Sequence, residues 1–367
     1  MKKNFLFRLS AIAMSLILVA CGGSTSEDVV ENETTAIESE ESLNVVVTTP
    51  MLGEFVKQVA GDSVVLDILM PAEADPHTYD PSPQDAAKIA DADIVLYVGI
   101  KYETSSLLKL IENTASTNAT LLEIGEEIDP IEFIDGERDH GHHDDHDEDG
   151  HDDHDEEGHD DDKDHDHDDE DGHDDHDEEG HEGHEGHDHG SEDPHFWFDP
   201  VRVAMAVEVI KDSLVSLDPA NSSTYEANAD NFISELTDLD AQVKELIESV
   251  SEDNRKIVTT HEALGYLEAR YGIEIFATII PSLSTADEIS PSQIADVIDV
   301  IEDNNIKVLF VESEAPSVYA ETVVAEAGIT AVTGLYVETL KDGQTYSDFL
   351  ISNVTLIVES LNSAGEG

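Results

Sequence analysis

The chain has 367 residues, with 86 acidic and 17 basic side chains and a formal net charge of −69 at pH 7. This length is enough for two domains with separate hydrophobic cores. The charge argues against nucleic-acid binding, which requires a cationic surface, and makes cations the expected partners.

The first 21 residues have the pattern of an export signal. A positively charged start precedes an apolar run of about 12 residues, which is too short to span a bilayer of roughly 30 Å. The signal ends in LVAC, which resembles a bacterial lipobox, and Cys21 is the only cysteine. We therefore expect a lipid on Cys21 that anchors the exported protein to the extracytoplasmic face of a membrane, in the periplasm or at the cell surface. An ordinary signal peptide with an incidental cysteine is the alternative.

Residues 22–42 are rich in Ser, Thr, Glu and Gly, a composition that predicts a flexible tether. Two series of short apolar runs follow, separated by segments with helical patterns, and each series predicts a four-stranded parallel sheet covered by helices. The expected strands are 44–49, 64–70, 93–99 and 119–125 in the first series, and 256–260, 273–279, 307–313 and 329–335 in the second. The prediction is an α/β protein with an N-terminal lobe at 43–217 and a C-terminal lobe at 251–367.

The segment between the two series, residues 200–250, has no strand signal. In its second part, 218–250, apolar residues such as Phe232, Leu236 and Leu239 recur at intervals of three and four, as on one face of a helix. A helix of this length would measure roughly 45 Å, long enough to join two lobes rigidly.

The histidines are distributed very unevenly: 15 of the 18 lie in one acidic run. This run has almost no apolar side chains to offset its ordering entropy, so we interpret 135–193 as a disordered loop inserted into the N-terminal lobe. As a spacer it would only add solubility, whereas as a collector it would present many weak sites for metal, which explains why histidine accompanies the acids. Its histidines are His140, His142, His143, His146, His151, His154, His159, His165, His167, His173, His176, His181, His184, His187 and His189.

Only His77, His195 and His261 lie outside this run. The first two stand in the similar phrases ADPHTYDP (74–81) and DPHFWFDP (193–200), and the third follows a predicted strand in KIVTTHEALGYLEARYG. Neutral imidazole is the commonest protein ligand of zinc, and open α/β sheets bind ligands at their strand ends. Each histidine alone is explained by a hydrogen-bonded structural role, but the three together predict a metal site.

Two local expectations follow from these phrases. If the Asp-Pro-His segments are extended, residues two apart face the same way, which places Tyr79 beside His77 and Trp197 beside His195 as shields against water. A helix beginning directly after His261 would disfavour the imidazolium form of that ring.

The chain also resembles the metal-binding lipoproteins that deliver zinc or manganese to bacterial ABC importers. The resemblance covers Leu43 to about Leu361 and depends on ADPHTYDPSP, DPHFWFDP, TTHEALGYLEARYG, ISPSQIADVIDVIEDNNIKVLFVE and YSDFLISN. It implies two four-stranded α/β lobes joined by one long helix, with metal held between them by His77, His195 and His261. A late Asp often supplies a fourth ligand in this family. Glu338 stands in its place here and could bind directly, bind through water, or be a solvated surface residue.

Three imidazoles with at most one carboxylate favour Zn²⁺, because Mn²⁺ prefers more oxygen ligands. A His-rich loop before the second motif is also typical of the zinc branch of this family. The resemblance thus implies a monomeric binding protein, not an enzyme, that passes Zn²⁺ to the membrane permease of an ABC importer. Alternatives are a manganese-delivering member, a metal-buffering adhesin, and a zinc-dependent hydrolase, for which no catalytic base has motif support.

Overall fold

The computed structural model describes residues 42–133, 192–314 and 318–365. The predicted signal with Cys21, the tether up to residue 41 and the fifteen histidines of the acidic run lie outside the described residues. In the part of the chain that is described, no helix is both long enough and apolar enough to cross a membrane.

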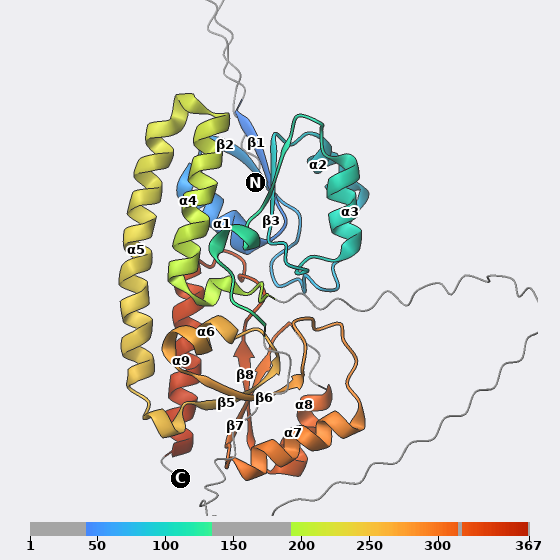
Figure 1. Ribbon diagram of the computed structural model, residues 1–367, viewed down its shortest axis with the longest axis vertical. Helices are drawn as coiled ribbons and strands as arrows, with labels where there is room; N and C mark the ends of the chain where they lie inside the picture. Colours follow the sequence, from blue (N-terminus) through green and yellow to red (C-terminus); the bar gives the residue numbers. More distant parts are fainter. Residues whose placement is uncertain (1–41, 134–191, 315–317, 366–367) are drawn as a thin grey trace, which may run out of the picture. The chain divides into compact units, whose positions relative to one another are not determined.

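The N-terminal lobe is a parallel sheet of four strands in the order β2-β1-β3-β4, with helices packed on it (Figure 1). All four predicted strands are present within a few residues of their expected positions. The elements of this lobe are β1 (Leu43–Val47), α1 (Pro50–Ala60), β2 (Val64–Ile68), α2 (Pro83–Ala90), β3 (Ile94–Tyr97), α3 (Ser105–Thr114), β4 (Thr120–Glu123) and the 3-10 helices η1 (Gly125–Ile128) and η2 (Phe196–Phe198).

The C-terminal lobe repeats this plan, with a parallel sheet in the order β6-β5-β7-β8. Its four predicted strands are also present, so the predicted fold class is confirmed. The elements of this lobe are η4 (Glu252–Asn254), β5 (Lys256–His261), α6 (Gly265–Tyr271), β6 (Glu274–Ile280), α7 (Pro291–Asp303), β7 (Val308–Glu312), α8 (Val318–Ala327), β8 (Thr330–Leu335) and α9 (Tyr346–Gly365).

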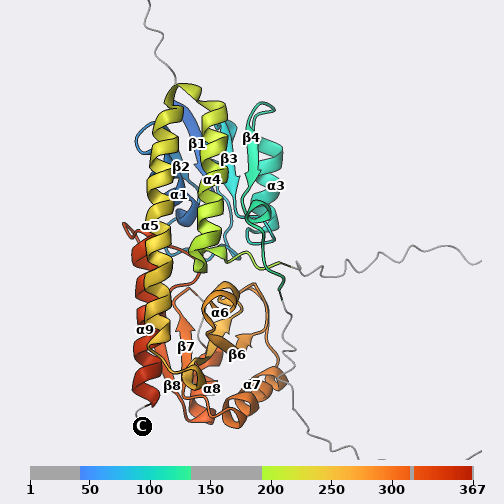
Figure 2. The ribbon, with the colours of Figure 1, turned by 60° about the vertical axis from the view of Figure 1, so that its left-hand side comes forward.

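Long helices connect the lobes. After α4 (Pro200–Leu217) and the short 3-10 turn η3 (Pro219–Asn221), α5 (Ser222–Glu248) packs against α1 and α4 and also against α9. Figure 2 shows α9 beside the lower part of α5 and α4 beside its upper part. The long helix therefore starts a few residues after the predicted position 218. One cluster of buried apolar side chains runs from β1 through α5 to α9, so the two lobes share a core.

Several helices begin with the same local device, a capping side chain followed by proline. Thr49, Ser82, Asp199 and Ser290 each accept a hydrogen bond from a backbone N–H in the first helical turn, and each precedes a proline at the first helical position. Proline is well suited to that position because its fixed φ is helical and its missing N–H is not needed. The final Asp-Pro of the second histidine phrase is therefore the start of α4.

The segment predicted as the inserted loop, 135–193, ends in two residues that belong to the folded part. Glu192 pairs with Glu132 in an isolated antiparallel bridge, and the backbone N–H of Asp193 donates to the carbonyl of Ile131 at 3.0 Å. The two ends of the insertion are thus held next to each other.

Candidate metal centre

Four side chains from both lobes converge between the sheets. His77 lies in the connection from β2 to α2, His195 directly precedes η2, His261 is the last residue of β5, and Glu338 follows β8 by three residues. His77, His261 and Glu338 lie at or beyond the carboxyl ends of β2, β5 and β8, and open α/β sheets bind their ligands at such ends. The structure thus brings together all four residues that the sequence singled out.

The geometry of the four groups is compact. One nitrogen from each histidine and one oxygen from Glu338 all lie within 4.8 Å of one another. Glu338 Oε1 is 3.5 Å from His77 Nε2, 3.4 Å from His195 Nε2 and 2.7 Å from His261 Nε2. Ligands bound tetrahedrally to zinc at roughly 2.0–2.1 Å are separated by about 3.3 Å. Two of the three distances therefore already match a tetrahedral site.

These atoms are buried and lack hydrogen-bond partners. The side chains of His195, His261 and Glu338 are 0% exposed and that of His77 is 3% exposed. The Nε2 atoms of the three histidines and both carboxylate oxygens of Glu338 make no hydrogen bond of acceptable geometry. Leaving so many buried polar atoms without hydrogen bonds is costly, so their convergence indicates a site built for a cation.

Two further carboxylates, which the sequence interpretation did not identify, orient two of the rings. Asp193 Oδ1 pairs with His195 Nδ1 at 2.8 Å, and Glu312 Oε2 pairs closely with His261 Nδ1. Each carboxylate also accepts the backbone N–H of its histidine, at 2.9 Å and 3.1 Å. A carboxylate on one ring nitrogen fixes the tautomer and turns the other nitrogen towards the metal position. Asp193 could have been suspected from its phrase, whereas Glu312 is distant in sequence and has no such signal.

The surrounding charges shift the ionisation of these groups. Burial opposes the charged form of His195, but the charge of Glu338 and the hydrogen bond with Asp193 outweigh it and raise the pKa of the ring to about 9. Burial likewise opposes the charge of His261, yet Glu312 and Glu338 raise its pKa well above the ordinary value. Burial favours a neutral Glu338, but the neighbouring histidines hold its pKa well below the usual range.

The expected effect of a helix terminus on His261 was wrong. Helix α6 begins at Gly265, four residues after the histidine, and has only seven residues. The carboxylates of Glu312 and Glu338, which face the ring, favour its charged form instead.

Aromatic side chains do cover the site, although only one is at its predicted place. The Trp197 ring lies 5.6 Å from that of His195, as expected. The ring against His77, however, is that of Tyr102, at 5.2 Å, while the hydroxyl of Tyr79 donates to the Leu69 carbonyl and to Asp85. The extended conformation was the wrong premise, because His77 lies in a turn and Trp197 in the 3-10 helix η2.

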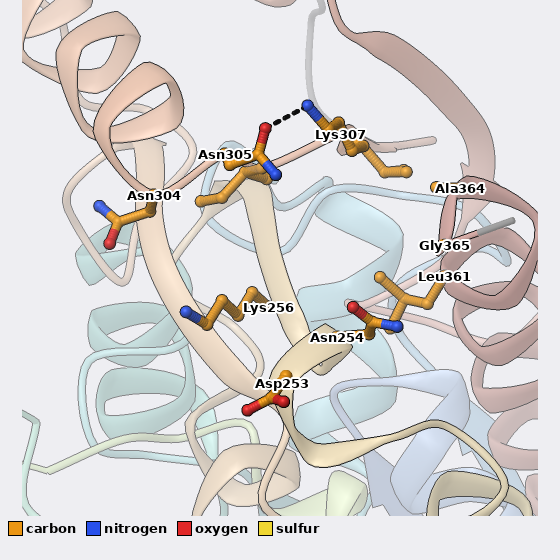
Figure 3. A pocket seen from close by; sticks show the side chains of 11 residues that line it. Asp253, Asn254, Lys256, Asn304, Asn305, Lys307, Leu361, Ala364 and Gly365 are labelled. Atoms are coloured by element: carbon orange, nitrogen blue, oxygen red, sulfur yellow. Dashed lines mark hydrogen bonds between the residues drawn. The ribbon is translucent and has the colours of Figure 1, made fainter. Parts of the chain in front are cut away.

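The opposite end of the C-terminal sheet, in the part of the chain that is described, offers no comparable group of ligands. A pocket of about 410 Å³ lies there, near Lys256, the first residue of the strand that ends in His261. Figure 3 shows mainly amide and ammonium groups around it, and its Lys307 is hydrogen-bonded to Asn305. Among the described residues, the cluster of His77, His195, His261 and Glu338 is the group of three or more such ligands that comes close enough to hold a metal, so it remains the candidate metal centre.

The sequence family described as ZnuA, zinc-uptake complex component A, periplasmic, matches residues 45–360. The chain belongs to the ZnuA family. Membership makes it a component of a metal-uptake system and a binding protein, not an enzyme.

Among curated relatives, the manganese-binding lipoprotein MntA of Halalkalibacterium halodurans is 25% identical over 366 residues, covering 98% of this chain and 99% of the relative. The iron ABC transporter substrate-binding lipoprotein MtsA of Streptococcus pyogenes is 25% identical, with coverage of 98% and 99%.

Solved structures support the ZnuA-type fold. The periplasmic zinc-binding protein TroA of Treponema pallidum superposes with a TM-score of 0.67 at 21% identity, covering 86% of this chain and 98% of TroA. A manganese-bound periplasmic metal-binding protein of Candidatus Liberibacter asiaticus gives a TM-score of 0.65 at 23% identity, with coverage of 86% and 98%. At these identities the likeness establishes the arrangement of the two lobes, and the metal has to be argued from the side chains.

Proposed function

We propose that this chain is an extracytoplasmic binding protein that captures Zn²⁺ and delivers it to an ABC-type importer, with His77, His195, His261 and Glu338 as the metal ligands. The observation that carries the proposal is the convergence within 4.8 Å of four buried ligand atoms that have no hydrogen-bond partner. Membership of the ZnuA family supports the same function.

The ligand set favours zinc as the transported ion. Zinc accepts four-coordinate sites made of imidazole and carboxylate, whereas Mn²⁺ prefers a larger share of oxygen ligands. Only Glu338 supplies oxygen among the four converging residues. Manganese is the second candidate, because three curated relatives are named for manganese binding or transport. Selectivity also depends on which metal is available in the environment of the cell.

The site is less suited to hydrolysis than to capture. A catalytic zinc keeps an open position for water or substrate and a nearby general base. Here the four ligand side chains are at most 3% exposed, so a substrate has little access to an ion held between them. A metal-buffering adhesin would use the same site without a transporter, so a neighbouring permease gene separates that alternative from an importer component.

The N-terminal region completes the proposed function. Cys21 would carry the lipid that anchors the protein to the membrane, consistent with the lipoprotein names of relatives that align over nearly the whole chain. The permease of an ABC importer would be its partner, since the relative MtsA is named as an ABC transporter substrate-binding lipoprotein. The fifteen histidines between residues 140 and 189 would form a weak collector that raises the local zinc concentration near the centre.

Single replacements of His77, His195 and His261 by Ala test the proposal. Loss of a residue that only orients a metal ligand typically lowers the affinity roughly 10–100-fold. Each histidine replacement should lower the affinity for zinc by more than this, because it removes one of four direct bonds to the metal. The measurement is competition with a zinc chelator, which excludes the weak sites. An unchanged affinity would remove that histidine from the ligand set. Glu338→Ala should also weaken binding, and an unchanged affinity there would leave a three-histidine site.

A further inference from the structure

The backbone that carries Glu338 is held by three side chains in succession. The carbonyl of Tyr336 accepts from Asn353 Nδ2 at 2.6 Å, that of Val337 from Trp197 Nε1 at 2.7 Å, and that of Glu338 from the Tyr102 hydroxyl at 2.8 Å. Asn353 belongs to helix α9 of the same lobe. Trp197 and Tyr102, by contrast, reach across from the N-terminal lobe, so the position of Glu338 depends on the other lobe.

Tyr102 contacts the centre in two ways. Its ring lies edge-on to the rings of His77 and His195, with centroids 5.2 Å and 5.8 Å apart, and its hydroxyl reaches the main chain of Glu338. The side chain is 1% exposed. Burial and the charge of Glu338 raise the pKa of the hydroxyl well above its ordinary value, so it remains a donor at physiological pH.

The chain holds Tyr102 in place with an unusual backbone. Gly99, Ile100 and Lys101 have φ angles of 77°, 50° and 60°, all in the left-handed region. This conformation is rare for a β-branched residue such as Ile100, and strained backbone of this kind is concentrated at functional sites. The carboxylate of the buried Glu103 stabilises the turn by accepting the N–H groups of Val98 and Gly99 at 2.8 Å and 2.9 Å.

We propose that Tyr102 is a positioning residue of the metal centre: its hydroxyl, donated across the lobe interface, sets the distance between the Glu338 carboxylate and the three imidazoles. The inference rests on the proposed metal-binding function. Tyr102 acts on the carboxylate through the main chain, because its hydroxyl fixes the backbone from which the Glu338 side chain starts.

The test is a double-mutant cycle between Tyr102→Phe and Glu338→Ala in the full mature chain, with zinc affinity measured in competition with a chelator. Tyr102→Phe keeps the ring contacts with both histidines and removes only the hydroxyl. It should weaken zinc binding about three- to tenfold, the effect of one lost hydrogen bond. In the Glu338→Ala background, where no carboxylate remains to be positioned, the same replacement should have no further effect.

Tyr225→Phe is the matched control. Tyr225 is also fully buried, and its hydroxyl donates to Asp218 at the start of α5, so it should leave zinc affinity unchanged. Trp197→Phe removes the hydrogen bond to the carbonyl of Val337, the residue before Glu338. It therefore tests independently whether the backbone at Glu338 must be held, and it should also weaken zinc binding.

The visible spectrum of the Co²⁺-substituted protein gives a second readout, because it reports the geometry of the ligands. The spectrum should change with Tyr102→Phe and not with Tyr225→Phe. Equal losses of affinity from Tyr102→Phe in both Glu338 backgrounds, or no loss in either, would overturn the inference. A wild-type protein without tight zinc binding would instead refute the proposed function.

Discussion

Replacing Glu312 by Gln is a demanding test of how the centre is organised. Glu312 is 2% exposed, and its carboxylate holds both the ring Nδ1 and the backbone N–H of His261. Gln has nearly the same shape but no charge, and its single amide oxygen cannot serve both donors equally well. Loss of an outer-shell carboxylate typically costs about 10–100-fold in metal affinity. We expect a decrease in that range, measured by chelator competition with zinc.

Asp218→Asn is the matched control for this experiment. The Asp218 carboxylate, just before α5, accepts hydrogen bonds from the Asn221 side chain and the Tyr225 hydroxyl, and these partners are not proposed ligands. Thermal unfolding should show lower stability in both variants, while only Glu312→Gln should lose zinc affinity. If Glu312→Gln proves too unstable to purify, Asp193→Asn removes the equivalent partner of His195. Full affinity in a folded variant of either carboxylate would refute the proposed role of these pairs.

Three further outcomes are expected. Trp197, the only tryptophan, lies beside His195, so zinc binding should change its fluorescence. The change should saturate at about one zinc per chain. A change that needs many equivalents of zinc would point to binding by the histidine-rich loop instead. Removal of residues 134–191 should leave a folded protein with one tight zinc site, because Glu132 and Glu192 already pair with each other at the two ends of the deleted segment. Zinc titration by calorimetry measures this site, and its loss would contradict the expectation. Without metal, the charged His195 ring should contribute to stability below its unfolded pKa of roughly 6.5 and lose this contribution as the pH rises through about 9. The unfolding temperature of the metal-free protein should therefore fall over this range more than that of the zinc-loaded protein, and equal falls would argue against the charged pair.

The sequence predicted the sheets well because their signal is local. Each strand is a short apolar run between helical patterns, and the cap-and-proline pairs at Thr49, Ser82, Asp199 and Ser290 mark where helices begin. The uneven distribution of histidines along the chain was enough to single out His77, His195 and His261. For Glu338 the sequence left three possibilities open, and the structure places it buried among the histidines.

What the sequence did not reveal depends on contacts between distant segments. Glu312 meets His261 only because β5 and β7 are neighbours in one sheet. Tyr102 replaces Tyr79 as the ring against His77 because a turn, not an extended strand, carries that histidine. The alternation of side chains along an extended chain could not foresee this turn, and no local pattern indicates which lobe holds the Glu338 backbone.

The most direct test of the central claim is the metal content of the purified mature chain after exposure to equal amounts of zinc and manganese. Dialysis against a weak chelator would first strip the low-affinity sites. We predict about one zinc and almost no manganese per chain, and no retained metal when His77, His195 and His261 are all replaced by Ala. Manganese in place of zinc would contradict the assignment of the ion, and metal retained by the triple variant would contradict the site itself.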